Sequence, residues 1–311
     1  MKTIIIISSI LVSFMILSCD ESINPYAEFK EDFILNGIIR GDTTYQIFTL
    51  SHSYQPNGPD PLTYKDDPAI AGSQIELYYD NKVYQLRDSS IVRADTSHFT
   101  SSFKFYYTEN FKPDVNKKIE LKAYLPNGQI LQSQTQTPNL TSDFFDPNND
   151  FFIPADTGTS SIIRWNASGK YAYAPHLQIN YYTNNNTTLK NIAVPLYYQS
   201  DNTPVYPEPT RNNFILIDTV TVRKTLDELV KLVTDRSSIK IINLTMDLLI
   251  FDEYLSSYYS SIQLGVSGFT IRIDDPDFSN IKGGLGIFGS YVRTKYTLRF
   301  SSPYLKSLGF Q

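Results

Sequence analysis

The sequence of 311 residues has a single cysteine, Cys19, and only three histidines. One thiol cannot form an intramolecular disulfide, so a stable fold must come from a packed hydrophobic core, which a chain of this size can build. The histidines, His52, His98 and His176, lie far apart, and neither a His-x-x-His nor a His-Glu-x-x-His spacing occurs. We therefore expect no transition-metal site.

An excess of positive charge is also missing. The chain has 27 Lys and Arg residues against 32 Asp and Glu residues, which gives a net charge of −5. Nucleic acids and anionic lipid headgroups are bound through a basic surface. The sequence therefore indicates no nucleic-acid partner and no electrostatic docking onto a membrane.

Known catalytic motifs are absent as well. No Gly-x-Ser-x-Gly nucleophile elbow occurs. The run Gly283-Gly284-Leu285-Gly286 lacks the Lys-Ser/Thr of a phosphate-binding loop and precedes a strand-like pattern. We expect its glycines to permit positive φ or close backbone approach. The prediction is a protein that is not an enzyme and has no cofactor; a hydrolase whose active site follows no motif is a less favoured alternative.

Two acidic stretches leave calcium binding open, because calcium prefers oxygen ligands at alternate positions. Neither has the Gly and the terminal Glu of an EF-hand loop, and a solvated turn is the favoured interpretation. Their oxygen-bearing side chains are Asp146, Asn148, Asp150, Asp274, Asp275 and Asp277.

The N-terminus has the parts of a secretory signal, with Lys2 before an apolar run from Ile4 to Leu17. This run is shorter than the roughly 20 residues that span a bilayer. The stretch Ile16-Leu17-Ser18-Cys19 resembles the bacterial lipoprotein box. That resemblance implies that residues 1–18 are a signal peptide and that Cys19 carries a diacylglyceryl group and a further acyl chain such as palmitate. Two or three chains give a stable anchor, whereas one gives only marginal binding.

Residues 19–31 are polar and acidic, and we interpret them as a tether. Acidic residues directly after the lipidated cysteine resemble the surface-export signal of Bacteroidota lipoproteins. This resemblance implies an outer-membrane protein that faces the outside of the cell.

From Asp32 onward the pattern is typical of β-strands. The sequence has 23 Tyr and 19 Phe residues, and apolar residues recur at every second position. Turn residues separate the short runs, as at Asp80-Asn81-Lys82, which predicts a hairpin. The expected fold class is mainly β, with two sandwich-like (immunoglobulin- or fibronectin-like) domains at 32–138 and 142–311. Trp165, the only tryptophan, resembles a core residue of such folds.

The second domain is expected to carry one or two short helices. Thr225-Leu226-Asp227-Glu228 is typical of a capping box and precedes an apolar stripe, which predicts a helix near 225–235. A second helix is expected at Asp252–Tyr259, because its aromatic and apolar residues share one helical face. The last strand is expected at Val292–Phe300.

Three stretches together resemble a Bacteroidota family of outer-membrane lipoproteins, domain of unknown function 4249. They are the lipoprotein box, Leu35–Ile39 and Ser279–Gly289. The family-like positions of the C-terminal stretch are Asn280, Gly283, Gly284, Gly286 and Phe288. Members are often encoded near TonB-dependent receptors, and no catalytic residues are assigned to them.

The resemblance implies a non-enzymatic binding or accessory role beside a TonB-dependent transporter in the outer membrane. A surface adhesin or a structural lipoprotein of the envelope is the alternative. The ligand, the oligomeric state and the identity of the partner do not follow from the residues.

Overall fold

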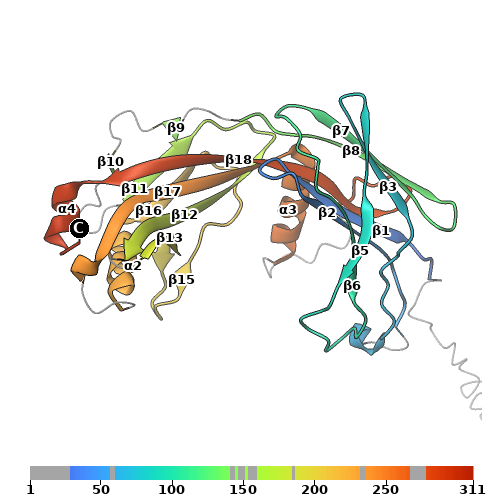
Figure 1. Ribbon diagram of the computed structural model, residues 1–311, viewed down its shortest axis with the longest axis horizontal. Coiled ribbons are helices and arrows are strands. Elements are labelled where there is room, and N and C mark those ends of the chain that lie inside the picture. Colours follow the sequence, from blue (N-terminus) through green and yellow to red (C-terminus); the bar gives the residue numbers. More distant parts are fainter. Residues whose placement is uncertain are drawn as a thin grey trace, which may run out of the picture.

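The structure is a computed structural model that describes residues 29–56, 60–140, 144–145, 151–152, 160–183, 186–231, 236–266 and 278–310. About 48% of the chain is strand and 14% is helix, which confirms the mainly β, sandwich-like class (Figure 1). The signal peptide, Cys19, most of the tether and both acidic stretches considered for calcium lie outside the described residues.

One nine-stranded sheet organises the fold, with β10 (Phe151–Phe152) paired to the end of β18. Neighbouring strands are antiparallel except at the β1–β18 and β10–β18 pairs, which are parallel. The remaining strands follow in spatial order: β13 (Asn186–Ala193), β12 (Ala172–Thr183), β17 (Ile239–Phe251), β18 (Leu285–Phe300), β1 (Phe33–Arg40), β2 (Gln46–His52), β6 (Phe103–Thr108) and β5 (Arg87–Ile91).

Strand β18 connects the two halves of the molecule. Its first part pairs with β1 over Leu285–Tyr291, and its later part pairs with β17 over Tyr291–Leu298. Figure 1 shows it as a long red ribbon that runs from β17 and β12 on the left to β1 on the right. The sheet is therefore continuous across the predicted boundary between 32–138 and 142–311. The predicted C-terminal unit supplies a strand and core residues to the predicted N-terminal unit.

A four-stranded sheet covers the N-terminal half of the large sheet, in the order β4 (Lys82–Gln85), β3 (Gln74–Tyr79), β7 (Lys118–Tyr124) and β8 (Ile130–Gln136). The core between the two sheets includes Leu35, Phe48, Ile75, Leu121 and Phe288, all nearly inaccessible to solvent. The predicted hairpin at 80–82 is confirmed, because β3 pairs with β4 across Asp80 (φ 49°) and Asn81 (φ 60°). Two successive positive φ angles are typical of a type I′ turn.

A second core lies on the same face of the large sheet, under the C-terminal half. It is covered by β16 (Phe214–Asp218) and β11 (Ser160–Trp165), with β9 (Phe144–Phe145) beside β11, and by helices α2 (Thr219–Lys231) and α4 (Ser302–Ser307). Trp165 is 2% exposed and lies beside Tyr173, which confirms it as a core residue. The smaller elements are β14 (Tyr197–Tyr198), β15 (Pro204–Val205), and the 3₁₀ turns η1 (Pro61–Thr63) and η2 (Arg236–Ser238).

Helix α2 begins earlier than the capping-box pattern predicted. It starts at Thr219, where the Asp218 carboxylate accepts a hydrogen bond from the Val220 N–H. Thr225 lies inside the helix, and its hydroxyl donates to the carbonyl of Thr221. The first turns are rich in β-branched residues, which have low helix propensity. Packing of Val222 into the core stabilises a helix that local propensity does not favour.

Helix α3 (Glu253–Val266) confirms the second expected helix and extends it. It packs on the opposite face of the large sheet, where Leu255 contacts a cluster that includes Ala172, Ala174 and Phe251. The final strand begins at Leu285, seven residues before the predicted start. Within the described part of the chain, no helix has both the length and the hydrophobicity to cross a bilayer.

Candidate functional site

The family-like C-terminal segment lies between strand β1 and strand β8. The Asn280 side chain binds the backbone of Phe288 twice: its Nδ2 donates to the Phe288 carbonyl (2.7 Å), and its Oδ1 accepts from the Phe288 N–H (2.8 Å). Phe288 is fully buried and lies beside Phe48, with 6.1 Å between the ring centroids. The Asn280 pair of hydrogen bonds thus replaces a sheet partner for the first part of β18.

Glycines in this segment permit close backbone approach. Gly286 has φ +115°, and a Cβ there would lie 2.1 Å from the carbonyl oxygen of Leu35. A Cβ at Gly284 would lie 2.4 Å from the carbonyl oxygen of Phe33, and one at Gly283 (φ +88°) would lie 2.8 Å from that of Ile130. The residues that carry the family resemblance therefore close the N-terminal core, and the chemistry of the segment is structural.

Beside this segment, a polar cleft opens where the four-stranded sheet meets the start of α3. It consists of two cavities of about 430 and 410 Å³ that share Gln134 and Tyr254, and we call it the junction cleft. The described residues that line it are Asn116, Lys118, Glu120, Leu121, Lys122, Gln132, Ser133, Gln134, Thr135, Gln136, Lys170, Tyr171, Asp252, Glu253, Tyr254, Asn280 and Lys282.

Asp252 is the buried carboxyl group of this cleft, with 2% of its surface exposed. Its Oδ2 accepts hydrogen bonds from the hydroxyls of Thr135 and Ser290, the latter at 2.8 Å. Its Oδ1 accepts from the Leu255 N–H at 2.7 Å and so caps the N-terminus of α3. Burial raises the pKa of the Asp252 carboxyl, and the hydrogen bonds from Thr135, Leu255 and Ser290 act in the opposite direction. Both carboxyl oxygens are thus already engaged.

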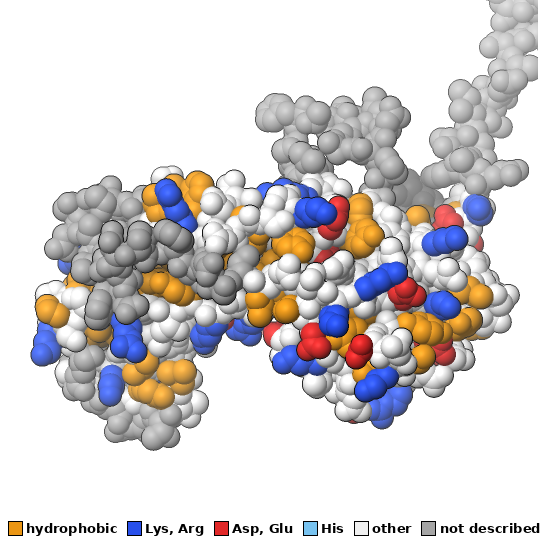
Figure 2. Space-filling view, turned by 90° about the horizontal axis from the view of Figure 1, so that it is seen from above, with side chains coloured by type: hydrophobic (Ala, Val, Ile, Leu, Met, Phe, Trp, Pro, Cys, Tyr) orange, Lys and Arg blue, Asp and Glu red, His pale blue; other side chains and the backbone are white. Residues whose placement is uncertain are grey.

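The remaining charges of the cleft are mostly basic. Among the described residues, four lysines line it, but only two glutamates besides the buried Asp252, although the net charge of the protein is negative. Lys118 pairs with Glu120 at 2.7 Å, and this pair is about half exposed. Figure 2 shows the molecule from above: on its right-hand half, which contains the four-stranded sheet, basic and acidic side chains are interspersed. The cleft therefore offers charged and amide hydrogen-bonding groups rather than an apolar pocket.

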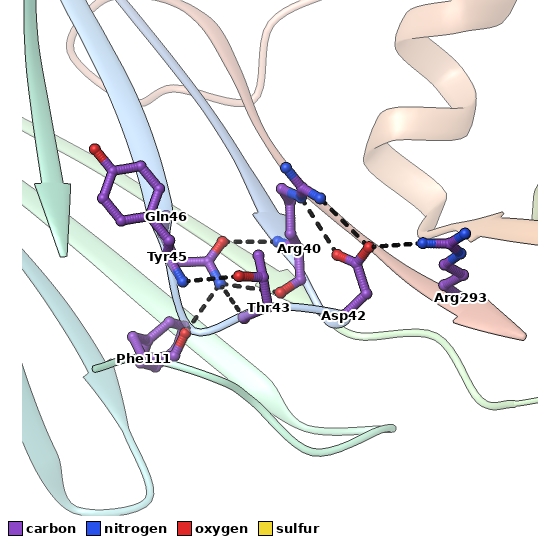
Figure 3. A network of polar contacts seen from close by, with 7 residues as sticks. All are labelled: Arg40, Asp42, Thr43, Tyr45, Gln46, Phe111 and Arg293. Atoms are coloured by element: carbon purple, nitrogen blue, oxygen red, sulfur yellow. Dashed lines mark hydrogen bonds and ion pairs between the residues drawn. The ribbon is translucent and has the colours of Figure 1, made fainter. Parts of the chain in front are cut away.

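On the opposite face of β18, a charge network connects the two halves (Figure 3). Arg293 donates to Asp247 on β17 through Nε (3.2 Å) and Nη2 (2.7 Å), and its Nη1 lies 3.6 Å from Asp42. Asp42, just after β1, also pairs with Arg40 at 3.3 Å. The hydrogen bonds to the Asp247 carboxyl raise the pKa of the Arg293 guanidinium. Both carboxylates of this network, Asp42 and Asp247, are paired with arginines, so the network has a structural role at the junction.

The turn after β1 is held by a buried amide, also visible in Figure 3. Gln46 is fully buried; its Oε1 accepts from the Arg40 N–H, and its Nε2 donates to the carbonyls of Arg40, Thr43 and Phe111 at 2.9–3.0 Å. This set of bonds satisfies the turn internally, so Gln46 has a structural role.

The histidines do not form a site. His52 lies on β2 and is 3.0 Å from Glu31, His98 contacts the carbonyl of Tyr64, and His176 is exposed on β12. Within the described ranges, no group of three or more His, Cys, Asp or Glu side chains could hold a metal ion.

Sequence reasoning did not find the junction cleft. Its walls come from β7, β8, the residues before β12, the start of α3 and the segment before β18. These parts are separated by up to about half the chain. The one local signal is Asp252, the first residue of the predicted second helix, because Asp commonly caps a helix N-terminus.

Comparison with known proteins adds no family. No protein-family model matches the sequence, and no curated protein matches it at a significant level.

Proposed function

We propose that this protein is a lipid-anchored protein of the bacterial outer membrane that faces the cell surface and binds a partner or ligand in the junction cleft. Its role is non-enzymatic and accessory to a neighbouring TonB-dependent receptor. The lipid anchor is supported by the lipoprotein box that ends at Cys19. The role beside a TonB-dependent receptor is supported by the resemblance to a family of such lipoproteins.

The observation that carries the binding role is the chemistry of the junction cleft. Side-chain amides, lysines and tyrosines line it, including Gln134, Lys170 and Tyr254. Tyrosine and amide side chains are frequent contact residues in protein recognition. A general acid or base must reach the substrate with a free oxygen. Asp252 is buried with both oxygens engaged, which favours binding over catalysis at this position.

The anchor is tested by Cys19→Ser in cells supplied with labelled palmitate. We expect the wild-type protein to incorporate the label and to sediment with membranes, and the variant to do neither. A variant that stays membrane-bound through its N-terminus, or a wild-type protein that takes up no label, would exclude the lipid anchor.

The binding role is tested with Tyr254→Ala in the cleft and Tyr206→Ala as the matched control, because Tyr206 is 48% exposed outside the cleft. After mild detergent extraction, the wild-type protein and the control should recover a TonB-dependent receptor, and the cleft variant should recover at least about fivefold less. Equal recovery by all three proteins would remove the cleft from receptor binding. Normal nutrient uptake with lost surface attachment in a deletion strain would favour the adhesin.

A further inference from the structure

Strand β8 is an edge strand of the four-stranded sheet. It pairs with β7 along its whole length, from Lys118↔Gln136 to Tyr124↔Ile130. On its other side, the described chain contributes a single two-bond bridge, in which Gln132 N–H donates to the Lys282 carbonyl (3.0 Å) and Lys282 N–H donates to the Gln132 carbonyl (2.8 Å). Among the residues that the structure describes, no strand lies beside most of this edge.

The backbone groups that this edge presents follow from strand geometry. Successive residues of a strand direct their N–H and C=O groups to opposite neighbours. Since those of Gln132 face Lys282, those of Gln134 and Gln136 also face away from β7. The Thr137 N–H, one residue further, donates to the Lys117 carbonyl at 2.9 Å, as this alternation requires. The edge therefore offers two donors and two acceptors at alternate positions.

The junction cleft lies along this edge. Gln134 and Gln136 line it on one side, and Lys170, Tyr171 and Tyr254 line it on the other. Natural sheets usually protect open edges, because an exposed edge pairs with other chains. Here, among the described residues, the edge borders a cavity of about 430 Å³. Beyond the Gln132–Lys282 bridge, residues 133–136 span roughly 10 Å at the usual strand rise, enough for a short extended segment.

We propose that the open edge of β8 binds an extended, acidic peptide segment of a protein partner by strand addition. This inference rests on the proposed function and specifies how its cleft recognises the partner. Backbone hydrogen bonds to Gln134 and Gln136 supply the pairing, as in other cases where a peptide adds a strand to a sheet. Lys118, Lys170 and Lys282 line the cleft and favour acidic side chains.

The test compares Gln134→Pro with Gln134→Ala in the detergent-purified full-length protein. Proline removes the N–H that faces the cleft and leaves the hydrogen bonds to β7, whereas alanine keeps the backbone donor. The probe is the fluorescent heptapeptide Glu-Val-Thr-Val-Glu-Thr-Glu, and its counterpart carries Lys in place of each Glu. Both variants lose the Gln134 side-chain amide, so their difference reports the backbone donor alone. We expect the acidic probe to bind the wild type and to bind the proline variant at least tenfold more weakly than the alanine variant. The basic counterpart should bind more weakly than the acidic probe.

Hydrogen exchange on the wild-type protein tests the same pairing without a substitution. At saturating acidic peptide, the Gln134 and Gln136 amides should exchange at least tenfold more slowly than in the free protein. Strand addition would be overturned by unchanged exchange or by no binding of the acidic probe. It would also be overturned if the proline and alanine variants bound the probe equally, or if both peptides bound equally. Membrane attachment and receptor recovery are measured separately, so a failure here is distinguishable from a failure of the anchored binding role.

Discussion

The hydroxyl of Thr135 donates a hydrogen bond to the carboxyl group of Asp252, although the two residues are 117 positions apart. The contact joins the edge strand β8 to the first turn of α3. Ser290 completes it from β18, between Phe288 of one core and Val292 of the other. One buried carboxyl group thus stabilises the place where three separate parts of the chain meet, directly beside the junction cleft.

The pKa of Asp252 predicts a pH dependence of stability. Burial raises this pKa above the ordinary value near 3.8, so between the two values the native state binds more protons than the unfolded state. The contribution of Asp252 to the free energy of unfolding is therefore largest at acid pH and falls as the pH rises through the raised pKa. Asp252→Asn cannot ionise and should lack this decrease. Urea denaturation from about pH 3.5 to 7 measures both proteins.

A companion variant sharpens this comparison. Thr135→Val removes a donor to the ionised carboxyl and should raise the pKa of Asp252 further, which extends the decrease to higher pH. Parallel stability curves for the wild type and Asp252→Asn would contradict the prediction.

The Glu76 carboxyl should show the opposite sign. The Tyr78 hydroxyl donates to it at 2.5 Å and is the largest cause of the lowered pKa of Glu76, against the effect of burial. The stabilising contribution of Glu76 is then present above its ordinary pKa near 4.5 and is lost as the pH falls through the lowered value. Glu76→Gln should flatten the acid limb of the stability curve. Tyr78→Phe should move that limb to higher pH, and an unchanged limb in both variants would refute the assignment.

Gly286 should not accept a side chain. Its φ is +115°, and a Cβ added there would lie only 2.1 Å from the Leu35 carbonyl oxygen, which leaves no room beside β1. We expect Gly286→Ala to lower the free energy of unfolding by about 2–3 kcal/mol or more. Gly169→Ala is the matched control, because a Cβ there would meet nothing within 4 Å. Equal urea midpoints for the two variants would show that the segment does not pack against β1 as described.

Loss of Arg293 should leave a buried charge without its strongest partner. Asp247 is 5% exposed and receives two hydrogen bonds from the guanidinium, which is itself 41% exposed. We expect Arg293→Ala to destabilise the fold by about 1–2 kcal/mol, the lower part of the range for such pairs because solvent reaches the arginine. Arg299→Ala, at an exposed position of the same strand, should change stability by less than about 0.5 kcal/mol. Thermal unfolding measures the stability of both variants. A similar loss of stability in the two would argue against a stabilising Arg293–Asp247 pair.

The local sequence pattern was enough to predict those parts of the fold that depend only on residues close together in the chain. The hairpin at Asp80-Asn81, the burial of Trp165 and the existence of α3 follow from turn chemistry, hydrophobicity and periodicity within short windows. The predicted start of α2 was wrong. The β-branched residues before Thr225 have low helix propensity, and only their packing into the core makes them helical. The lipid anchor and the outer-membrane role stay predictions of the N-terminal sequence.

By itself, the sequence determined that this protein is built from β-strands with apolar residues on alternate positions, because that pattern buries one face of a sheet whichever strands pair. The tertiary structure alone decided which strands meet. The parallel pairing of Leu35 with Gly286, the β18 strand that serves both cores, and the cleft beside the open edge of β8 all join residues far apart in the chain. Such contacts depend on the summed packing of the whole core and on backbone hydrogen bonds that any residue can make, so no local signal encodes them.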